Sequence, residues 1–115
     1  MRQYEIWQAS LPPPVGRRPV LLLSRDSAYA VLNKVIVAEV TSTVRDIPVE
    51  VRLGPGEGLS RPSVANLDNV HVVSRGDLVS RLGTLPASRS GEVKRALGYA
   101  LDWPELKYHD ERDTE

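Results

Sequence analysis

The sequence contains no cysteine and only two histidines, His71 and His109. The absence of cysteine excludes a disulfide framework and a cysteine-based zinc site. Two imidazoles alone are a poor ligand set for a dedicated transition-metal site. We therefore expect a protein without a metal and without a cofactor.

Long apolar stretches are also missing. The longest uninterrupted apolar run, residues 19–23, is far below the roughly 18 residues that a membrane span needs. No basic start followed by an apolar signal core opens the chain, and no glycine-rich nucleotide-binding motif is present. We expect a cytoplasmic protein that makes no contact with a membrane.

The 115 residues, 41% of them apolar, are enough for one compact domain with a modest core. The net charge of zero hides an asymmetry: residues 1–101 carry 13 Lys and Arg against 9 Asp and Glu, whereas residues 102–115 carry 2 against 6. Eleven of the 13 cations are arginines, whose planar fork matches phosphate oxygens. Charge alone leaves two interpretations open, a polyanionic partner such as a nucleic acid or a set of arginines that serves solubility.

Most of the chain has the pattern of short β-strands. Alternating or continuous apolar residues, separated by turn clusters rich in Gly and Pro, predict strands over 3–9, 19–24, 34–41, 47–53, 63–67 and 70–73. Residues 27–33 are expected to form a helical turn or a loop.

Longer helices are confined to the last third. Ser74 and Asp77 have the spacing of a capping box, which predicts a short helix through Val79. A terminal helix is predicted by apolar residues that recur on one helical face: Val93, Ala96, Leu97, Ala100 and Leu101. Residues 1–103 are expected to be a single domain, and residues 104–115 an acidic, flexible tail. Short strands followed by one helix predict a mainly β fold, a small, strongly bent antiparallel barrel.

Several fragments recur in the order and spacing of one known family. They are Ile6-Trp7, Arg18-Pro19-Val20-Leu21, Thr41-Ser42-Thr43, Pro48-Val49-Glu50-Val51, Asp68-Asn69 and Leu85-Pro86. Over residues 3–101 the chain thereby resembles the MazF/PemK toxins, which have the CcdB/PemK fold, a barrel related to the Src-homology-3 type. The resemblance implies a homodimeric, metal-independent, sequence-selective endoribonuclease of a type II toxin–antitoxin system. It also implies single-stranded RNA and a cognate antitoxin as partners.

In the chemistry implied by the family, the ribose 2′-hydroxyl attacks the adjacent phosphorus and leaves a cyclic phosphate and a free 5′-hydroxyl. By this resemblance Arg18 and Thr41 are the catalytic candidates, since a guanidinium and a hydroxyl can both donate to phosphate oxygens. Arg17, Ser42, Thr43 and Asn69 are the candidates for RNA contacts. An Arg beside Pro and a Thr-Ser-Thr run are otherwise ordinary features of strand ends.

The sequence departs from the family at the proton acceptor. Many members carry an acidic residue in the loop before the Arg-Pro strand, whereas residues 11–17 contain no carboxylate here. Arginine stays protonated near neutral pH and is a poor base. Three candidates remain: His71, Asp68 and Asp26.

Two other functions share this sequence pattern. A non-enzymatic toxin of the CcdB type, which binds DNA gyrase, has the same fold. Those relatives lack the Arg-Pro and strand-end Thr pair and rely on a Trp-Gly-Ile chain end, which this chain does not have. A catalytically inert RNA-binding barrel is the third interpretation. The acidic residues 108–115 could compete weakly with RNA phosphates or could only aid solubility.

Overall fold

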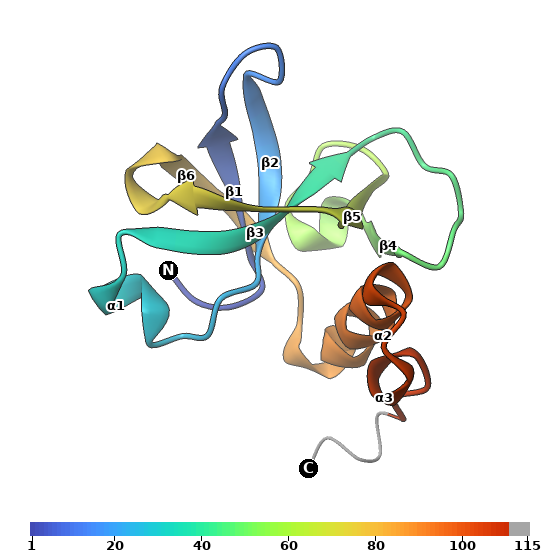
Figure 1. Cartoon of the computed structure of the whole chain (residues 1–115). Coiled ribbons are helices and arrows are strands. Elements are labelled where there is room, and N and C mark those ends of the chain that lie inside the picture. The colour runs from blue at the N-terminus through green and yellow to red at the C-terminus, as the bar shows by residue number, and fades with distance from the viewer. Residues whose placement is uncertain (111–115) are drawn as a thin grey trace.

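A curled sheet dominates the computed structural model, which describes residues 1–110 (Figure 1). Its six antiparallel strands lie in the order β4-β5-β3-β2-β1-β6. Their bounds are β1 Glu5–Ser10, β2 Arg17–Leu22, β3 Lys34–Thr41, β4 Glu50–Leu53, β5 Ser63–Ser74 and β6 Leu78–Thr84. The prediction of a mainly β, strongly bent antiparallel fold with a C-terminal helix is confirmed.

Three helices accompany the sheet within residues 1–110. They are the single turn α1 Ala28–Val31, the long helix α2 Ser90–Leu101 and the short helix α3 Pro104–Lys107, with 3-10 turns η1 Pro55–Glu57, η2 Arg75–Asp77 and η3 Ala87–Arg89. Helix α2 lies beside the β4 and β5 end of the sheet, and α3 packs against α2 (Figure 1). The longest helix in residues 1–110 has 12 residues, so none there could cross a membrane.

Strand alternation divides the core into two clusters, one on each face of the sheet. On β3, Ala38 and Val40 belong to the cluster that packs against α2. Val35 and Val37 point to the other face, into a cluster that includes Tyr29 of α1. The alternation continues to the end of β3, so each side chain there lies on one of these two faces. The face on which a side chain lies determines which other functional side chains it can meet.

The largest departure from the predicted strands is in β5. Residues 63–67 and 70–73 form one strand of 12 residues, not two. The pairing of β3 with β5 shifts between Ala38, which pairs with Val70, and Glu39, which pairs with Asn66. Residues 67–69 are the extra residues of this bulge, and the polar Asp68 and Asn69 gave the sequence signal of a turn.

The short helix predicted after Ser74 is wrong. Arg75–Asp77 form one 3-10 turn, and Leu78 already begins strand β6. Ser74 makes no side-chain capping bond. Leu78 is buried and its strand pairs with β1, so sheet hydrogen bonds replace the expected helix.

The terminal helix is confirmed, although its apolar stripe is not wholly covered. Val93 and Ala96 are buried against the sheet, whereas Leu101 is 59% exposed. The first residues of the expected tail form α3. A Cβ on Gly98 would lie 2.3 Å from the backbone N of Lys107, so the glycine permits α3 to approach α2 closely.

Candidate active site

The pairing of β2 with β3 brings Arg18 and Thr41 together. Val20 pairs with Glu39 and Leu21 with Ala38, and continuing this antiparallel register places Arg18 opposite Thr41. Arg18, Glu39 and Thr41 share the face of Val20 and Val37, because side chains two residues apart point the same way. They lie where that face passes from buried core to solvent.

Glu39 is the buried centre of this group, with 7% of its surface exposed. Its Oε1 accepts a hydrogen bond from Nη1 of Arg18 at 2.8 Å, and its Oε2 contacts Nε2 of His71. The Arg18 and His71 side chains are 37% and 39% exposed. A buried carboxylate thus holds two accessible, chemically versatile side chains.

Two cavities meet at Arg18 and Thr41. One, of about 300 Å³, is lined by Arg18, Glu39, Thr41, Thr43, Arg45, Glu50, Asn66 and Asn69. The other, of about 230 Å³, is lined by Arg17, Arg18, Pro19, Val40, Thr41, Ser42, Leu59, Ser60, Arg61 and Ser63. Because both cavities share the guanidinium and the hydroxyl, a polymer could occupy both with one phosphate at the junction.

The hydroxyl of Thr41 is oriented by its neighbour. The backbone N–H of Thr43 donates to Oγ1 of Thr41 at 3.1 Å. Since the oxygen accepts that bond, its own proton remains available for a phosphate oxygen. The predicted RNA contacts also gather here: Thr43 and Asn69 line the first cavity, and Arg17 and Ser42 the second.

Asp68, a candidate proton acceptor, is not brought to Arg18. It lies in the β5 bulge, where its backbone N–H donates to Oδ1 of Asn66 at 2.9 Å. It lines an apolar groove with Leu67, Leu101 and others on the face toward α2. The bulge turns Asp68 away from the site, and the sequence, which predicted two separate strands here, gave no sign of that bulge.

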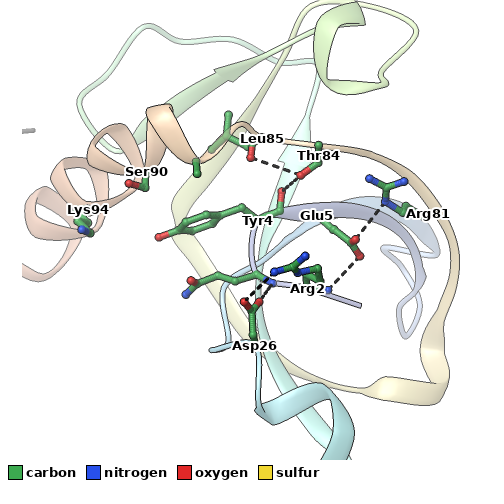
Figure 2. A pocket seen from close by; sticks show the side chains of 11 residues that line it. Arg2, Tyr4, Glu5, Asp26, Arg81, Thr84, Leu85, Ser90 and Lys94 are labelled. Carbon is green, nitrogen blue, oxygen red and sulfur yellow. Dashed lines mark hydrogen bonds and ion pairs between the residues drawn. The ribbon is translucent and has the colours of Figure 1, made fainter. Parts of the chain in front are cut away.

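Asp26 lies at the other end of β2. Figure 2 shows it beside Arg2 in a polar cavity of about 610 Å³ near the start of β1. Its Oδ1 accepts the backbone N–H of Gln3 at 2.7 Å. The charges there are largely paired, for example Arg81 with Glu5 at 3.3 Å, and the cavity does not include Arg18. Of the three proposed acceptors, only His71 reaches the Arg18 group.

Sequence reasoning missed Glu39. A single acidic residue within the run of apolar residues 35–40 was the available signal, since a carboxylate is seldom buried without a partner. Its partners come from β2 and β5, so only the register of three strands identifies them. In residues 1–110 no three Asp, Glu or His side chains converge in a manner suited to a metal.

The fold and the site together define a small curled-sheet protein with two adjoining cavities that are lined by arginines. Residues 2–101 match the family described as PemK-like, MazF-like toxin of type II toxin–antitoxin system. The chain is 42% identical over 99 residues to a probable endoribonuclease, MazF5 of Mycobacterium tuberculosis, covering 85% of this chain and 90% of the relative. It is 40% identical over 88 residues to endoribonuclease MazF3 of that organism, covering 75% and 85%.

Solved structures agree. The Mycobacterium tuberculosis toxin MazF-mt6 superposes with a TM-score of 0.80 at 37% identity, covering 85% of this chain and 96% of that one. A mycobacterial endoribonuclease in complex with its cognate antitoxin superposes with a TM-score of 0.78 at 25% identity, covering 90% and 97%. The chain belongs to the PemK/MazF-like toxin family.

Proposed function

We propose that this chain, a MazF-type toxin endoribonuclease, cleaves single-stranded RNA at a short sequence without a metal and thereby stops translation. The observation that carries the proposal is the junction of two cavities at Arg18 and Thr41. Unpaired nucleotides can enter such small cavities, whereas a duplex presents its bases in grooves. The loop side chains around the two cavities would select the sequence.

The proposed reaction is an internal transfer at phosphorus. The O2′–P bond forms and the P–O5′ bond breaks, which gives a 2′,3′-cyclic phosphate and a 5′-hydroxyl. The 2′-hydroxyl loses one proton and the 5′-oxygen takes one up. Arg18 and Thr41 would donate to the non-bridging oxygens, whose negative charge grows in the transition state. One guanidinium N–H bonds Glu39, and the other donors of the Arg18 fork remain for phosphate.

The first prediction tests these two residues. Arg18→Ala and Thr41→Ala should each lower the rate of RNA cleavage by about 10²-fold or more, as removal of an oxyanion donor does. Thr41→Ser keeps the hydroxyl and should retain most of the rate. The measurement is single-turnover cleavage of a long mixed-sequence RNA in EDTA, with mapping of the new ends.

Arg25→Ala is the matched control for Arg18. Arg25 follows β2 at the end remote from the site, where its Nε donates to Oγ of Ser27 at 3.0 Å. This variant should cleave at the wild-type rate. Wild-type rates in Arg18→Ala and Thr41→Ala would remove both residues from catalysis. Binding of RNA without any cleavage by the wild-type protein would favour an inert RNA-binding barrel, and gyrase inhibition without cleavage would favour the CcdB type.

A cognate antitoxin is the second partner that we propose. The solved mycobacterial relative was described with its cognate antitoxin, and the two cavities here carry Arg17, Arg18, Arg45 and Arg61. An acidic antitoxin segment that occupied these arginines would exclude RNA directly. RNA and antitoxin should then compete for the toxin.

We further propose a homodimer, held through an exposed apolar patch on the α2 side of the sheet. Ile36 and Val72 are cross-strand partners on β3 and β5, and they are 44% and 60% exposed. An apolar groove of about 500 Å³ lies beside them, lined by Leu23, Ile36, Leu67, Asp68, Val70, Leu97, Ala100 and Leu101. A patch of this kind is typical of an interface.

The second prediction is that Val72→Asp converts the dimer to a monomer, because a buried, unpaired carboxylate is costly at an interface. Light scattering coupled to size exclusion measures the mass. Val79→Asp, on β6 at the other edge of the sheet, is the control because Val79 is 48% exposed. A wild-type monomer, or an unchanged dimer in Val72→Asp, would contradict the proposed interface.

A further inference from the structure

Glu39 is an unusual residue to bury for stability alone. Removing a carboxylate from water is costly, and replacing a buried ion pair with apolar residues often leaves a protein equally stable or more stable. Its neighbours on the same face, Val35 and Val37, are apolar core residues. A valine would continue that pattern at position 39. We therefore explain the buried carboxylate by the side chains that it binds, and not by a contribution to the stability of the core.

Both oxygens of Glu39 are engaged, one by Arg18 and one by His71. A buried carboxylate with both oxygens occupied is poorly placed to take a proton from a substrate hydroxyl. His71 is different, because its side chain is 39% exposed and only its Nε2 contacts Glu39. In residues 1–110 no protein group forms a hydrogen bond with Nδ1 of His71.

The contact with Glu39 selects one form of the neutral imidazole. A carboxylate only accepts hydrogen bonds, so Nε2 must carry the proton that it shares with Glu39. Nδ1 then has a free lone pair, which is the requirement for accepting a proton. When Nδ1 takes up that proton, the imidazolium is stabilised by the negative carboxylate at Nε2.

We infer that Glu39 is the positioning residue of an acid–base pair in which His71 accepts the proton of the ribose 2′-hydroxyl. The inference rests on the proposed function. It places the carboxylate of the site on β3, at Glu39, because residues 11–17 contain none. As the O2′–P bond forms, the proton passes from O2′ to Nδ1 of His71. Glu39 stays ionised, the P–O5′ bond breaks, solvent supplies the proton taken up by the 5′-oxygen, and His71 returns its proton to solvent.

The same carboxylate also fixes Arg18. The 2.8 Å bond from Nη1 holds the guanidinium on Glu39, and Arg18 lines both cavities. Along the shared face of β3 the order is Val37, which pairs with His71, then Glu39, then Thr41, which lies opposite Arg18. A phosphate held by Arg18 and Thr41 would have one of its two riboses on the His71 side, and the inference requires that this ribose be the one that carries the attacking 2′-hydroxyl.

The test begins with the tautomer of His71 in the wild-type protein without RNA. Nitrogen-15 NMR distinguishes the two neutral forms, and we expect Nε2–H with an unprotonated Nδ1. In Glu39→Gln the amide can donate or accept, so the two tautomers should both be populated. A wild-type His71 that is Nδ1–H would overturn the inference, whatever the activity, because Nδ1 could not accept a proton.

The kinetic test compares three variants with the wild type on an RNA that contains the mapped cleavage site. Glu39→Gln and His71→Ala should each lower the single-turnover rate by about 10²-fold, the usual size of a general-base effect, with RNA affinity changed less than about threefold. Added imidazole should partly restore His71→Ala and should not restore Glu39→Gln. The double variant should be no more than about threefold slower than His71→Ala, because residues that act as a unit are not additive.

Glu5→Gln is the matched control. Glu5 is a carboxylate on β1 whose side chain is 13% exposed and is paired with Arg81, outside the site. The Glu5→Gln variant should cleave within about twofold of the wild-type rate, because the carboxylate that it removes lies outside the site. Wild-type rates in Glu39→Gln and His71→Ala, together with loss in Arg18→Ala, would overturn this inference and leave the endoribonuclease in place. Absence of cleavage by the wild-type protein itself would instead overturn the proposed function.

Discussion

Arg89 shows how one side chain can join three segments of the fold. Its Nε and Nη2 donate to the two carboxylate oxygens of Glu92 at 2.7 and 2.8 Å. Nη2 also donates to the backbone carbonyl of Arg52 at 2.6 Å, and Nη1 lies 3.7 Å from Oε2 of Glu57. The start of α2 is thereby tied to β4 and η1. The hydrogen bonds from Arg89 lower the pKa of Glu92, although partial burial opposes this change.

The third prediction concerns this pair. Because the pKa of Glu92 is lower in the folded protein, its contribution to stability is complete above its unfolded pKa, near 4.5, and is lost as pH falls through the folded pKa. Glu92→Gln should lower the free energy of unfolding at pH 7 by about 1 kcal/mol, less than a buried charged hydrogen bond contributes, because solvent screens this partly exposed pair. The deficit should shrink below pH 4.5. Urea titrations at several pH values measure it.

Glu105→Gln, on the exposed side of α3, is the control for that series and should behave like the wild type across the pH range. An equal deficit for Glu92→Gln at pH 7 and well below pH 4.5 would show that shape, not charge, explains the loss.

At the scale of elements, the curl of the sheet brings the turn after β4 against β6, the strand at the opposite edge. Gly58 of this turn and Gly83 of β6 lie in contact. A Cβ on Gly83 would lie 2.0 Å from the carbonyl oxygen of Glu57, and one on Gly58 would lie 2.1 Å from that of Leu82. Gly58 also has a φ of +94°, which favours glycine. These two glycines let the half-barrel close on itself.

The fourth prediction is that Gly83→Ala weakens this closure. The new methyl group meets backbone atoms that cannot rotate away, so we expect a loss of about 2 kcal/mol, in the range of overpacked sites. The melting temperature should fall by roughly 8 °C in a chain of this size. Gly76→Ala, where a Cβ would meet nothing within 4 Å, is the control and should change little. Equal melting of Gly83→Ala and wild type would mean that the contact is easily relaxed.

The elements differ in how well the sequence predicts them, and local pattern explains the difference. Strand β3 begins and ends where its apolar run predicts, at Lys34 and Thr41. Strand β5 was divided in the prediction because a bulge carries the same polar residues as a turn. Strand β6 was missed because its pairing with β1 comes from residues about 70 positions away in the chain.

The site shows the same limit. Arg18 and Thr41 were predictable from the family resemblance, and the register confirms that they adjoin. The role that we propose for Glu39 could not be predicted, because it depends on contacts with β2 and β5 that no local pattern encodes. Asp26 was misplaced because closeness in sequence to the end of β2 says nothing about which end of the sheet holds the site.

At the scale of the whole molecule, this protein has no net charge, whereas its proposed substrate, RNA, is a polyanion. The four arginines of the two cavities face the proposed RNA path, whereas residues 102–115 carry six acidic residues against two basic ones. Residues 111–115 lie outside the described part of the structure, but their charges still contribute to the field around the protein. Three acids against one arginine give them a net charge of −2. The long-range field therefore works against RNA binding more than the cavities alone would suggest.

The last prediction follows from this opposition. Replacing the three acids in Glu111→Gln, Asp113→Asn and Glu115→Gln changes the net charge from 0 to +3 without shortening the chain. At low salt this triple variant should bind RNA more tightly than the wild type. The difference should shrink as the ionic strength rises toward about 0.15 M, where screening acts within about 8 Å. Fluorescence anisotropy with labelled RNA over a salt series measures how the affinity of each protein changes with salt.

A variant that only shuffles the order of residues 111–115 keeps the charge and should match the wild type. Identical affinity of the triple variant and the wild type at every salt concentration would show that these charges only aid solubility, because an electrostatic competitor must act most strongly where screening is weakest.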